Sequence, residues 1–335
     1  MADLAIILTV RSQSERLKNK VLTTIGKRSL LYWTIKRLST IPGSQVVVAI
    51  TRNREDDKIV KVAEGLGVPV FRGSENDVVE RVDKAWKAHV PDAKLILRAL
   101  GDCPFIATEI IERAKDMMLK YDRKEAMVWH LPPETWPVYG AREFPYSISG
   151  WNKIARSATS REEREHPDLY FHNNRRRFDI LYHEPPKQVY FRDYRIEVDY
   201  PEDVKLIKAI HGKIGITSSL PSVIKFLDKN EDIARLNRER VEKTGPLSSY
   251  QFQQRRYWLY QMTGKPFLQW NGKWYKPFNK EGAKPIWCKC GRVVLGFAQG
   301  GLLYTVGGEV IEQGKTKCRD CGIVRVWDRA VERKG

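Results

Sequence analysis

The chain has 335 residues, of which 42% are hydrophobic, and its formal net charge is +18. This length and hydrophobic content suggest about two domains and exclude a wholly disordered chain. They also exclude a membrane-spanning helix, because no run approaches the roughly 20 apolar residues that a bilayer requires. The apolar start, Met1–Val10, lacks a basic segment and is interpreted as a buried strand instead of a signal peptide, so we expect a cytoplasmic protein.

The first 130 residues alternate between strand-like and helix-like segments. Apolar, strand-like runs are found at Leu4–Val10, Gln45–Ile50, Pro69–Phe71 and Leu95–Leu100. Helical spacing is found at Ser29–Leu38, Asp56–Leu66, Asp77–His89 and Thr108–Tyr121, with Thr108 as the expected N-cap of the last helix. Such alternation predicts an α/β fold whose mostly parallel sheet is covered by helices on both faces.

The chain beyond residue 129 is at first irregular, and then regular segments return. We expect a strand at Arg195–Val198 and helices at Pro201–His211, Leu220–Leu227 and Asp232–Lys243. After Gly245-Pro246 the composition becomes aromatic and basic, and a Gly-rich, β-prone stretch follows near the end. We therefore predict a domain at residues 1–245, a connecting segment at 246–284 and a small β-rich domain at 285–330.

A basic loop follows the first predicted strand. It carries three cations, Arg11, Arg16 and Lys20, at the place where α/β proteins bind ligands, the carboxyl end of a parallel strand. Guanidinium groups, an ammonium and backbone amides together suit a triphosphate. On spacing alone, a solvated basic loop is at least as good an interpretation.

Two carboxylates also follow predicted strands. Asp102 comes directly after Leu95–Leu100, and Asp199 closes Arg195–Val198. A carboxylate in such a place can hold a hard cation that bridges phosphate oxygens. A turn or a helix cap is the alternative for Asp102. Glu202 and Asp203 fall in the first turn of a predicted helix, where a structural role suffices.

Together these motifs resemble those of the cytidylyltransferases that make CMP-activated sugars. The resemblance is strongest to the spore-coat-polysaccharide-type branch, which is related to the CMP-sialate and CMP-KDO synthetases, and it covers roughly residues 1–243. The stretch Arg11–Lys20 is similar to the signature R-x-x-S-x-R-L-x-x-K of that group. The other matching segments are Ala49–Thr51 with Asp56-Asp57, Phe71–Ser74, Asp77–Arg81, Arg98 with Gly101–Pro104, Glu163–His166, Val198–Asp203, Phe226-Leu227 and Leu236-Asn237.

The resemblance implies a Rossmann-like nucleotidyltransferase that transfers a nucleoside monophosphate, CMP from CTP, to a sugar acid or similar small acceptor. It implies Mg²⁺ held by Asp102 and Asp199, with Asp102 also at the nucleotide. It further implies that Arg11, Arg16 and Lys20 are the catalytic, triphosphate-binding cations and that Ser14 and Arg72 line the nucleotide pocket. Such chemistry needs no covalent intermediate, so Cys103 is interpreted as a small buried residue. Relatives of this group are often dimers, and a homodimer is one expectation.

One departure concerns the acceptor. Pro167 follows Glu163–His166, where the branch continues with Val-Thr, and Trp136–Glu143 matches the branch's acceptor segment only loosely. His166 could contact the acceptor, but a hydrogen-bonded structural histidine is favoured.

Four cysteines form two close pairs near the end of the chain: Cys288, Cys290, Cys318 and Cys321. Four thiolates can hold one Zn²⁺ tetrahedrally, and zinc would organise a ribbon too small to be stable alone. We therefore predict a structural zinc ribbon, ahead of disulfides or free thiols. This part lies outside the family resemblance.

The chain from Pro246 onward is also basic, with 16 Lys and Arg against 6 Asp and Glu. A nucleic acid partner and a solvated surface explain this charge about equally well. The aromatic and basic residues of Tyr250–Trp287 could stack on bases, although packing is favoured. The alternative function is accordingly a nucleotidyltransferase-like protein that acts on or binds nucleic acid through this tail.

Overall fold

The structure is a computed structural model that describes residues 2–14, 16–129, 138–141, 143–183 and 194–238, together with the backbone of seven short strands after residue 267. The chain divides into two compact units. The first comprises Met1–His130, Pro137–Asn173 and Phe178–Lys243, and the second comprises Leu131–Trp136, Asn174–Arg177 and Thr244–Gly335. Among the described residues, no helix is long and apolar enough to cross a membrane.

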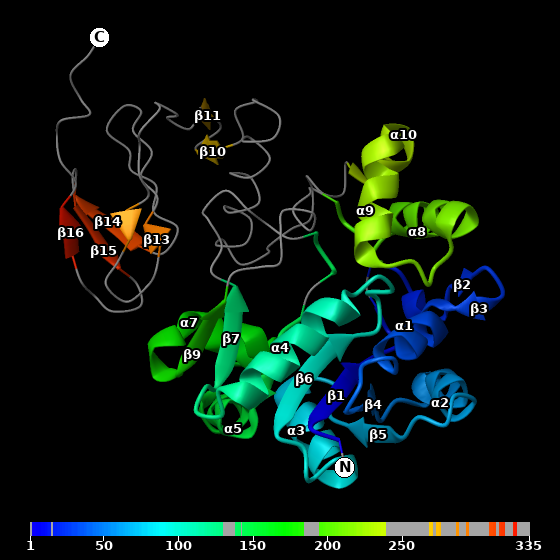
Figure 1. Cartoon of the computed structure of the whole chain (residues 1–335), viewed down its shortest axis with the longest axis horizontal. Coiled ribbons are helices and arrows are strands. Elements are labelled where there is room, and N and C mark those ends of the chain that lie inside the picture. Colours follow the sequence, from blue (N-terminus) through cyan, green and yellow to red (C-terminus); the bar gives the residue numbers. More distant parts are fainter. Residues whose placement is uncertain are drawn as a thin grey trace. The chain divides into compact units, whose positions relative to one another are not determined.

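A seven-stranded sheet organises the first unit (Figure 1). Its order is β5-β4-β1-β6-β8-β7-β9, where the strands are β1 (Leu4–Thr9), β4 (Ser44–Thr51), β5 (Val70–Gly73), β6 (Leu95–Leu100), β7 (Ala126–Trp129), β8 (Tyr146–Ser147) and β9 (Ile180–His183). The short β8 is antiparallel to β6 and β7, and the other pairings are parallel. The predicted mostly parallel α/β sheet is confirmed.

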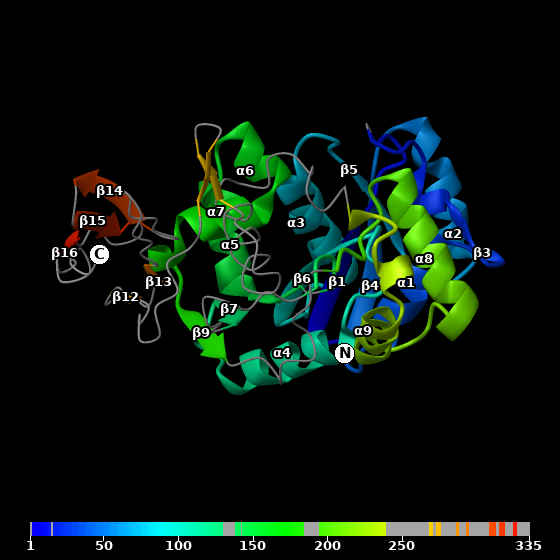
Figure 2. The same ribbon diagram turned by 90° about the horizontal axis from the view of Figure 1, so that it is seen from above.

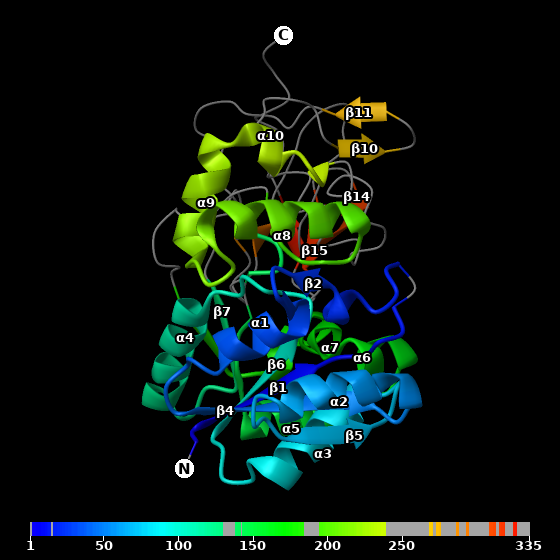
Figure 3. The same ribbon diagram turned by 90° about the vertical axis from the view of Figure 1, so that its right-hand side faces the viewer.

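Helices cover both faces of this sheet. Figure 3 shows α3 (Val78–His89) and α5 (Ile148–Ser157) on one side and α1 (Leu30–Leu38) and α8 (Pro201–Ile214) on the other. On the α3 side, Ile7 and Val47 of neighbouring strands pack in one core cluster with Val82 of α3. All six residues of β1 are buried, because a central parallel strand is covered on both faces. The remaining helices are α2 (Asp57–Glu64), α4 (Thr108–Lys120), α6 (Arg161–Glu165), α7 (Pro167–Asn173), α9 (Leu220–Lys229) and α10 (Glu231–Ala234).

The register of β1 and β6 decides where the following loops lie. Thr9, the last residue of β1, pairs with Leu100, the last residue of β6, in a parallel ladder. The basic loop after β1 and the Asp102 loop after β6 therefore leave the sheet side by side at its carboxyl edge. This is the edge at which open α/β sheets bind ligands.

Two helix starts show how local capping works here. Asp77 caps α3 by accepting a hydrogen bond from the Glu80 backbone N–H at 2.8 Å. The predicted Thr108 cap of α4 is wrong: Thr108 is the first helical residue, and Ala107 stands at the N-cap without a side-chain hydrogen bond. The Ala107 N–H instead donates to the Ala141 carbonyl at 2.7 Å, so a neighbouring segment satisfies the backbone at this end.

The predicted strand at Arg195–Val198 is also wrong. The backbone forms an isolated bridge between Arg195 and Tyr139, and its next hydrogen bonds go to two different segments. Ile196 N–H donates to the Tyr139 carbonyl, whereas Val198 N–H donates to the Asp102 carbonyl. A strand requires one continuous partner, and this segment is shared between two loops. Over the predicted Asp232–Lys243 helix, the described part contains the end of α10 (Glu231–Ala234), a turn and a helical Arg238, and residues after 238 lie outside the described part.

The second unit contains short antiparallel strand pairings, one of which lies in the predicted connecting segment 246–284. Strand β10 (Leu268–Trp270) pairs with β11 (Lys273–Tyr275), and β12 (Ile286–Trp287) pairs with β13 (Val293–Val294). A three-stranded sheet joins β14 (Gly308–Glu312), β15 (Lys315–Cys318) and β16 (Val324–Val326). Cys288, Cys290 and Cys321 lie outside the described residues, as does the side chain of Cys318. The zinc ribbon therefore stays a prediction.

A close helix contact makes a test of the packing. A Cβ added at Gly150 in α5 would lie 2.1 Å from the Glu125 backbone oxygen, whereas a Cβ at Gly212 in α8 would meet nothing within 4 Å. We expect Gly150→Ala to lower the free energy of unfolding by about 1–3 kcal/mol through overpacking. Gly212→Ala should raise it by about 0.5–1 kcal/mol through helix propensity. Urea unfolding of both variants measures the two changes in the free energy of unfolding. Equal changes in the two variants would contradict the prediction.

Candidate active site

Three buried carboxylates gather at the carboxyl edge of the sheet. Asp102 comes from the loop after β6, and Glu197 and Asp199 come from the irregular segment that precedes α8. Their oxygens lie within 4.8 Å of one another, and the residues are 8%, 8% and 2% exposed. The Val198 N–H bond to the Asp102 carbonyl at 3.0 Å holds the two segments together.

A glycine allows this crowding. Gly140 has a φ of 84°, and a Cβ there would lie 2.7 Å from the Glu197 Cβ. The segment that contains Gly140 can therefore pass directly over Glu197. Sequence reasoning did not single out Glu197. The signal that could have found it is its position two residues before Asp199, because side chains two residues apart along an extended segment point to the same face.

Two cations of the basic loop reach this cluster. Lys20 Nζ donates to Asp102 and, at 2.7 Å, to Asp199 Oδ1, and its side chain is 12% exposed. Arg16 Nη2 lies 3.0 Å from the same Asp199 oxygen, and its guanidinium stacks over the Tyr200 ring at 5.6 Å. The structure thus brings together four of the residues predicted from sequence: Arg16, Lys20, Asp102 and Asp199.

A buried arginine also donates hydrogen bonds to the carboxylate cluster. Arg195, 1% exposed, donates to Asp199 Oδ2 at 2.5 Å and to Asp203 at 3.3 Å. Asp203 is fully buried and also accepts from the Asp199 and Tyr200 backbone N–H groups, each at 2.9 Å. Asn237 donates to Asp203 at 2.7 Å. Asp203 therefore has the structural role expected from its place at the start of a helix, and it fixes the backbone of Asp199.

The charges of this site shift its protonation. Burial, reinforced by Asp102 and Asp199 and opposed by Arg195 and Lys20, raises the pKa of Glu197 to about 8. Burial acts in the same direction on Asp199, but Lys20, Arg195 and Arg16 outweigh it and hold the pKa of that carboxyl well below its usual range. Although burial disfavours the ammonium of Lys20, Asp102 and Asp199 raise its pKa. At neutral pH the site therefore contains a charged Lys20–Asp199 pair beside a protonated Glu197.

A second buried aspartate anchors the basic loop. Both oxygens of Asp56, which is 1% exposed, accept hydrogen bonds. Ser12 donates to Oδ1 from its N–H at 2.7 Å and its hydroxyl at 2.6 Å, and Thr51 donates to Oδ2 from its N–H at 3.0 Å and its hydroxyl at 2.6 Å. The carboxylate thus ties the start of the loop to the end of β4. The motif containing Asp56 was recognised in the sequence, but its partners are set by the fold.

The remaining predicted nucleotide residues make other contacts. Arg11, whose side chain is 42% exposed, lies 3.8 Å from Glu165 of α6. Arg72 on β5 forms an exposed ion pair with Asp57. Ser14 is half-buried in the basic loop. None of these contacts joins the carboxylate cluster, so the roles of Arg11, Ser14 and Arg72 stay predictions.

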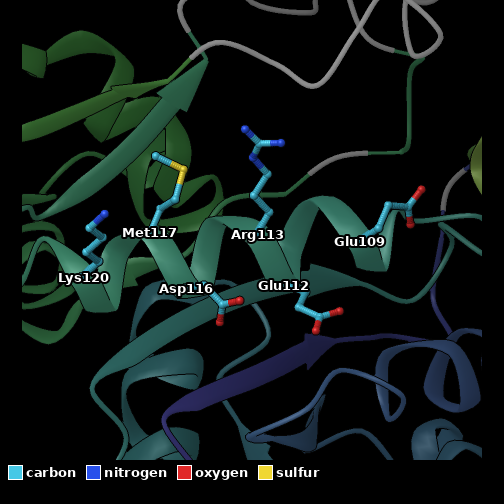
Figure 4. A pocket seen from close by; sticks show the side chains of 6 residues that line it. All are labelled: Glu109, Glu112, Arg113, Asp116, Met117 and Lys120. Atoms are coloured by element: carbon cyan, nitrogen blue, oxygen red, sulfur yellow. The ribbon is translucent and has the colours of Figure 1, made fainter.

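Cys103 is 3% exposed beside the site. Burial, together with the negative charges of Asp102 and Glu197, raises the pKa of its thiol. A thiol that resists ionisation is a poor nucleophile, which agrees with its interpretation as a packing residue. A hollow along α4, lined by Glu109, Glu112, Arg113, Asp116, Met117 and Lys120, offers mixed charges from a single helix and no converging set of carboxylates (Figure 4).

The carboxylate cluster fits a hard divalent cation. Mg²⁺ prefers oxygen ligands and is commonly held by one or two carboxylates together with substrate phosphates. Asp102, Glu197 and Asp199 supply such oxygens from rigid, buried positions. They form the one candidate metal cluster within the part of the chain that the structure describes.

Comparisons with known proteins agree with this geometry. Residues 5–261 match the cytidylyltransferase family. An uncharacterized protein of Methanocaldococcus jannaschii is 30% identical over 240 residues, which cover 71% of this chain and 96% of that protein. The spore coat polysaccharide biosynthesis protein SpsF of Bacillus subtilis is 28% identical over 243 residues, covering 70% and 98%. A solved cytidylyltransferase of Leptospira borgpetersenii is similar with a TM-score of 0.63 and 26% identity, covering 70% of this chain and 97% of that one.

The mostly parallel sheet, with cations and carboxylates at its carboxyl edge, is that of a nucleotidyltransferase, and these similarities support an enzyme of this class. More particularly, the chain belongs to the cytidylyltransferase family. The family resemblance noted in the sequence is thereby confirmed for residues 5–261.

The raised pKa of Glu197 gives a test of the cluster. Its pKa is about 4.5 in the unfolded chain and about 8 in the fold, so its contribution to stability is complete below the lower value and is lost as pH rises to the higher one. Glu197→Gln mimics the protonated acid. With a chelator present, we expect the variant to gain stability over the original chain by up to about 1.4 kcal/mol per pH unit across that window. Urea unfolding across this pH range checks it, and a pH-independent difference would contradict it.

Proposed function

We propose that this protein transfers CMP from CTP to a sugar acid or a similar small acceptor and releases pyrophosphate in a Mg²⁺-dependent reaction. The observation that carries the proposal is the convergence of Lys20 and Arg16 on the buried carboxylates Asp102 and Asp199. Membership of the cytidylyltransferase family supports CTP as the donor. The similarity to a spore coat polysaccharide biosynthesis protein supports a sugar-like acceptor.

In this proposal Asp102 and Asp199, with Glu197 beside them, would hold Mg²⁺. When bound, Mg²⁺ neutralises negative charge on the phosphate oxygens. Arg11, Arg16 and Lys20 would bind the triphosphate, and Ser14 and Arg72 would line the nucleotide pocket. A guanidinium can bind two phosphate oxygens at once, whereas the ammonium of Lys20 acts as a compact point charge.

The reaction requires positioning more than covalent chemistry. A hydroxyl oxygen of the acceptor attacks the α-phosphorus in line, the bond to the bridging oxygen breaks, and pyrophosphate leaves with that oxygen. The rigid carboxyl edge of the sheet would fix the groups relative to one another, and fixed charges would stabilise the departing pyrophosphate without reorganising at the moment of reaction. The Asp56 anchor would keep the loop cations in place during this step.

In this scheme the ammonium of Lys20 can pair either with the carboxylates or with the triphosphate. Without ligands, its ammonium neutralises Asp102 and Asp199. A cation bound by these carboxylates would compete with it, and a triphosphate would offer Lys20 new partners. Nucleotide and metal should therefore bind cooperatively, because each relieves the charge imbalance that the other creates.

The roles proposed for the second unit remain predictions. Structural Zn²⁺ and nucleic acid binding through the basic tail rest on sequence alone, since the tail side chains lie outside the described residues. The homodimer, which was expected from the family resemblance of residues 1–243, also stays a prediction.

The metal-ligand assignment predicts loss of activity. Asp102→Asn and Asp199→Asn should each lower the rate of CTP-dependent pyrophosphate release by about a hundredfold or more, because each removes a charge from the reacting centre. Lys205→Ala, which changes an exposed residue of α8, is the control and should keep its rate. Full turnover in both Asn variants would sink the proposed function.

The cooperativity between metal and nucleotide can be measured separately. We expect Mg²⁺ and CTP together to raise the midpoint of thermal unfolding by more than the sum of their separate effects. In Lys20→Met, Mg²⁺ alone should stabilise more than it does in the original chain, because the competing ammonium is gone. Additive shifts in the original chain would contradict the model of exchange at Lys20, and a larger shift with UTP than with CTP would contradict the donor.

A further inference from the structure

Arg81 and Arg98, on the α3 side of the sheet, each have a buried Nε donor without an acceptor among the described residues. Arg81 of α3 is 3% exposed, and the side chain of Arg98 on β6 is 13% exposed. In the part of the chain that the structure describes, the Nε atom of each is buried and has no hydrogen-bond partner. Buried polar groups are nearly always satisfied, because an unpaired donor costs about 1–3 kcal/mol. Because the charge of Arg98 acts on Arg81, these two donors are candidates for one acceptor from outside the chain.

Both guanidinium groups are held in place by their other nitrogens. Arg81 Nη1 donates to the carbonyl oxygens of Ser74 and Glu75 at the start of α3. Arg98 Nη1 donates to Asp168 Oδ2 at 3.0 Å, and the buried Tyr146 hydroxyl donates to the other oxygen of Asp168 at 3.0 Å. These contacts orient the side chains before any ligand arrives. A ligand would therefore bind without a large ordering cost.

Positive charge is concentrated around these donors. Burial, followed by the charges of Arg98 and Arg11, lowers the pKa of Arg81 to about 10. Asp56 and Glu75 act against this shift, but both Asp56 oxygens already accept hydrogen bonds from Ser12 and Thr51. An anion would relieve the repulsion among three guanidinium groups, whereas a neutral ligand would not.

We infer that Arg81 and Arg98 form a subsite for an oxyanion, either a carboxylate or a phosphate. Arginine donors suit planar or tetrahedral oxyanions, with short, charge-assisted hydrogen bonds. Helices α6 and α7, which supply Glu165 and Asp168, lie next to α3 and α5 around this region (Figure 2).

The position of Arg98 on its strand indicates which substrate would supply the anion. Arg98 lies within β6, whereas Asp102 lies in the turn that follows the end of that strand at Leu100. The triphosphate already has the cations of the basic loop near Asp102. We therefore assign the subsite to an anionic group of the acceptor, an assignment that rests on the proposed function. The oxyanion subsite itself does not.

Acetate and inorganic phosphate serve as probes. We would titrate each at constant ionic strength against the nucleotide-free full chain in a chelator and follow the midpoint of thermal unfolding. Acetate is the main probe, since phosphate can also bind the loop cations. Arg98→Gln should weaken acetate binding about tenfold or more, the value of one lost charged hydrogen bond. Arg235→Gln, which removes an exposed arginine paired with Glu231, is the charge-matched control and should bind acetate unchanged.

A second variant protects the test against simple unfolding. Asp168→Asn removes the internal carboxylate that Arg98 Nη1 now contacts, so acetate should bind more tightly. The asparagine oxygen can still accept from Arg98 and orient it, so only the competing negative charge is lost. A variant that merely folds poorly cannot produce this gain. Equal acetate responses in the original chain, Arg98→Gln and Asp168→Asn would overturn the subsite.

CTP binding in the presence of Mg²⁺ separates the sources of the anion. Unchanged CTP binding by Arg98→Gln supports the acceptor assignment. If the variant instead binds CTP and UTP tenfold more weakly, to the same extent, the subsite binds a nucleotide phosphate and the acceptor assignment is overturned. If Arg98→Gln lost the preference for CTP over UTP, the oxyanion subsite would be overturned. The arginines would then contact the base of the nucleotide. If the original chain binds acetate but no CTP, the proposed function fails while the subsite stands.

Discussion

Mutual repulsion among Asp102, Glu197 and Asp199 is the constraint on which this site depends. Their oxygens lie within 4.8 Å of one another in a buried setting, where like charges cannot all remain ionised. The fold meets this constraint in two ways. Lys20, Arg16 and Arg195 supply positive charge. Glu197 has a pKa raised to about 8, so it keeps its proton at neutral pH. The same concentration of charge that must be neutralised in the ligand-free protein is what suits the edge to a divalent cation.

Backbone geometry makes the crowding possible. The parallel register of β1 and β6 places the two loops at one edge, and the Val198–Asp102 hydrogen bond adds the third segment. Beneath them, Asp203 accepts from Arg195, Asn237 and two backbone N–H groups, so the network is satisfied throughout. A fully satisfied polar network gives a rigid, single arrangement, which is what positioning catalysis requires. The carboxylates are therefore prepared for their ligand before it binds.

The contrast between the two cationic regions is informative. At the carboxylate cluster, each cation has an internal counter-charge, and ligand binding becomes an exchange of partners. At Arg81 and Arg98, the buried Nε donors have no acceptor among the described residues, although Arg98 also pairs with Asp168 through Nη1. One region is suited to a cation with a polyphosphate, and the other to a simple anion. In our proposals, the two regions would bind negatively charged groups of two substrates at separate points.

The sequence by itself determined the class of fold and the family. The alternation of apolar runs and amphipathic helices depends on local periodicity, which is readable without long-range contacts, and the motifs around Arg16, Lys20, Asp102 and Asp199 lie in the order that the cytidylyltransferases share. What only the tertiary structure decided was pairing between distant residues. Lys20 meets Asp102 and Asp199 across 82 and 179 residues, and Glu197 enters the cluster because its segment bridges two loops instead of forming the expected strand. The hydrogen-bond partners of Asp56, and the Nε donors of Arg81 and Arg98 that have no acceptor among the described residues, likewise follow from the tertiary structure. Periodicity records which face of an element is buried, but it does not record which charges, on elements far apart in the chain, will share that interior.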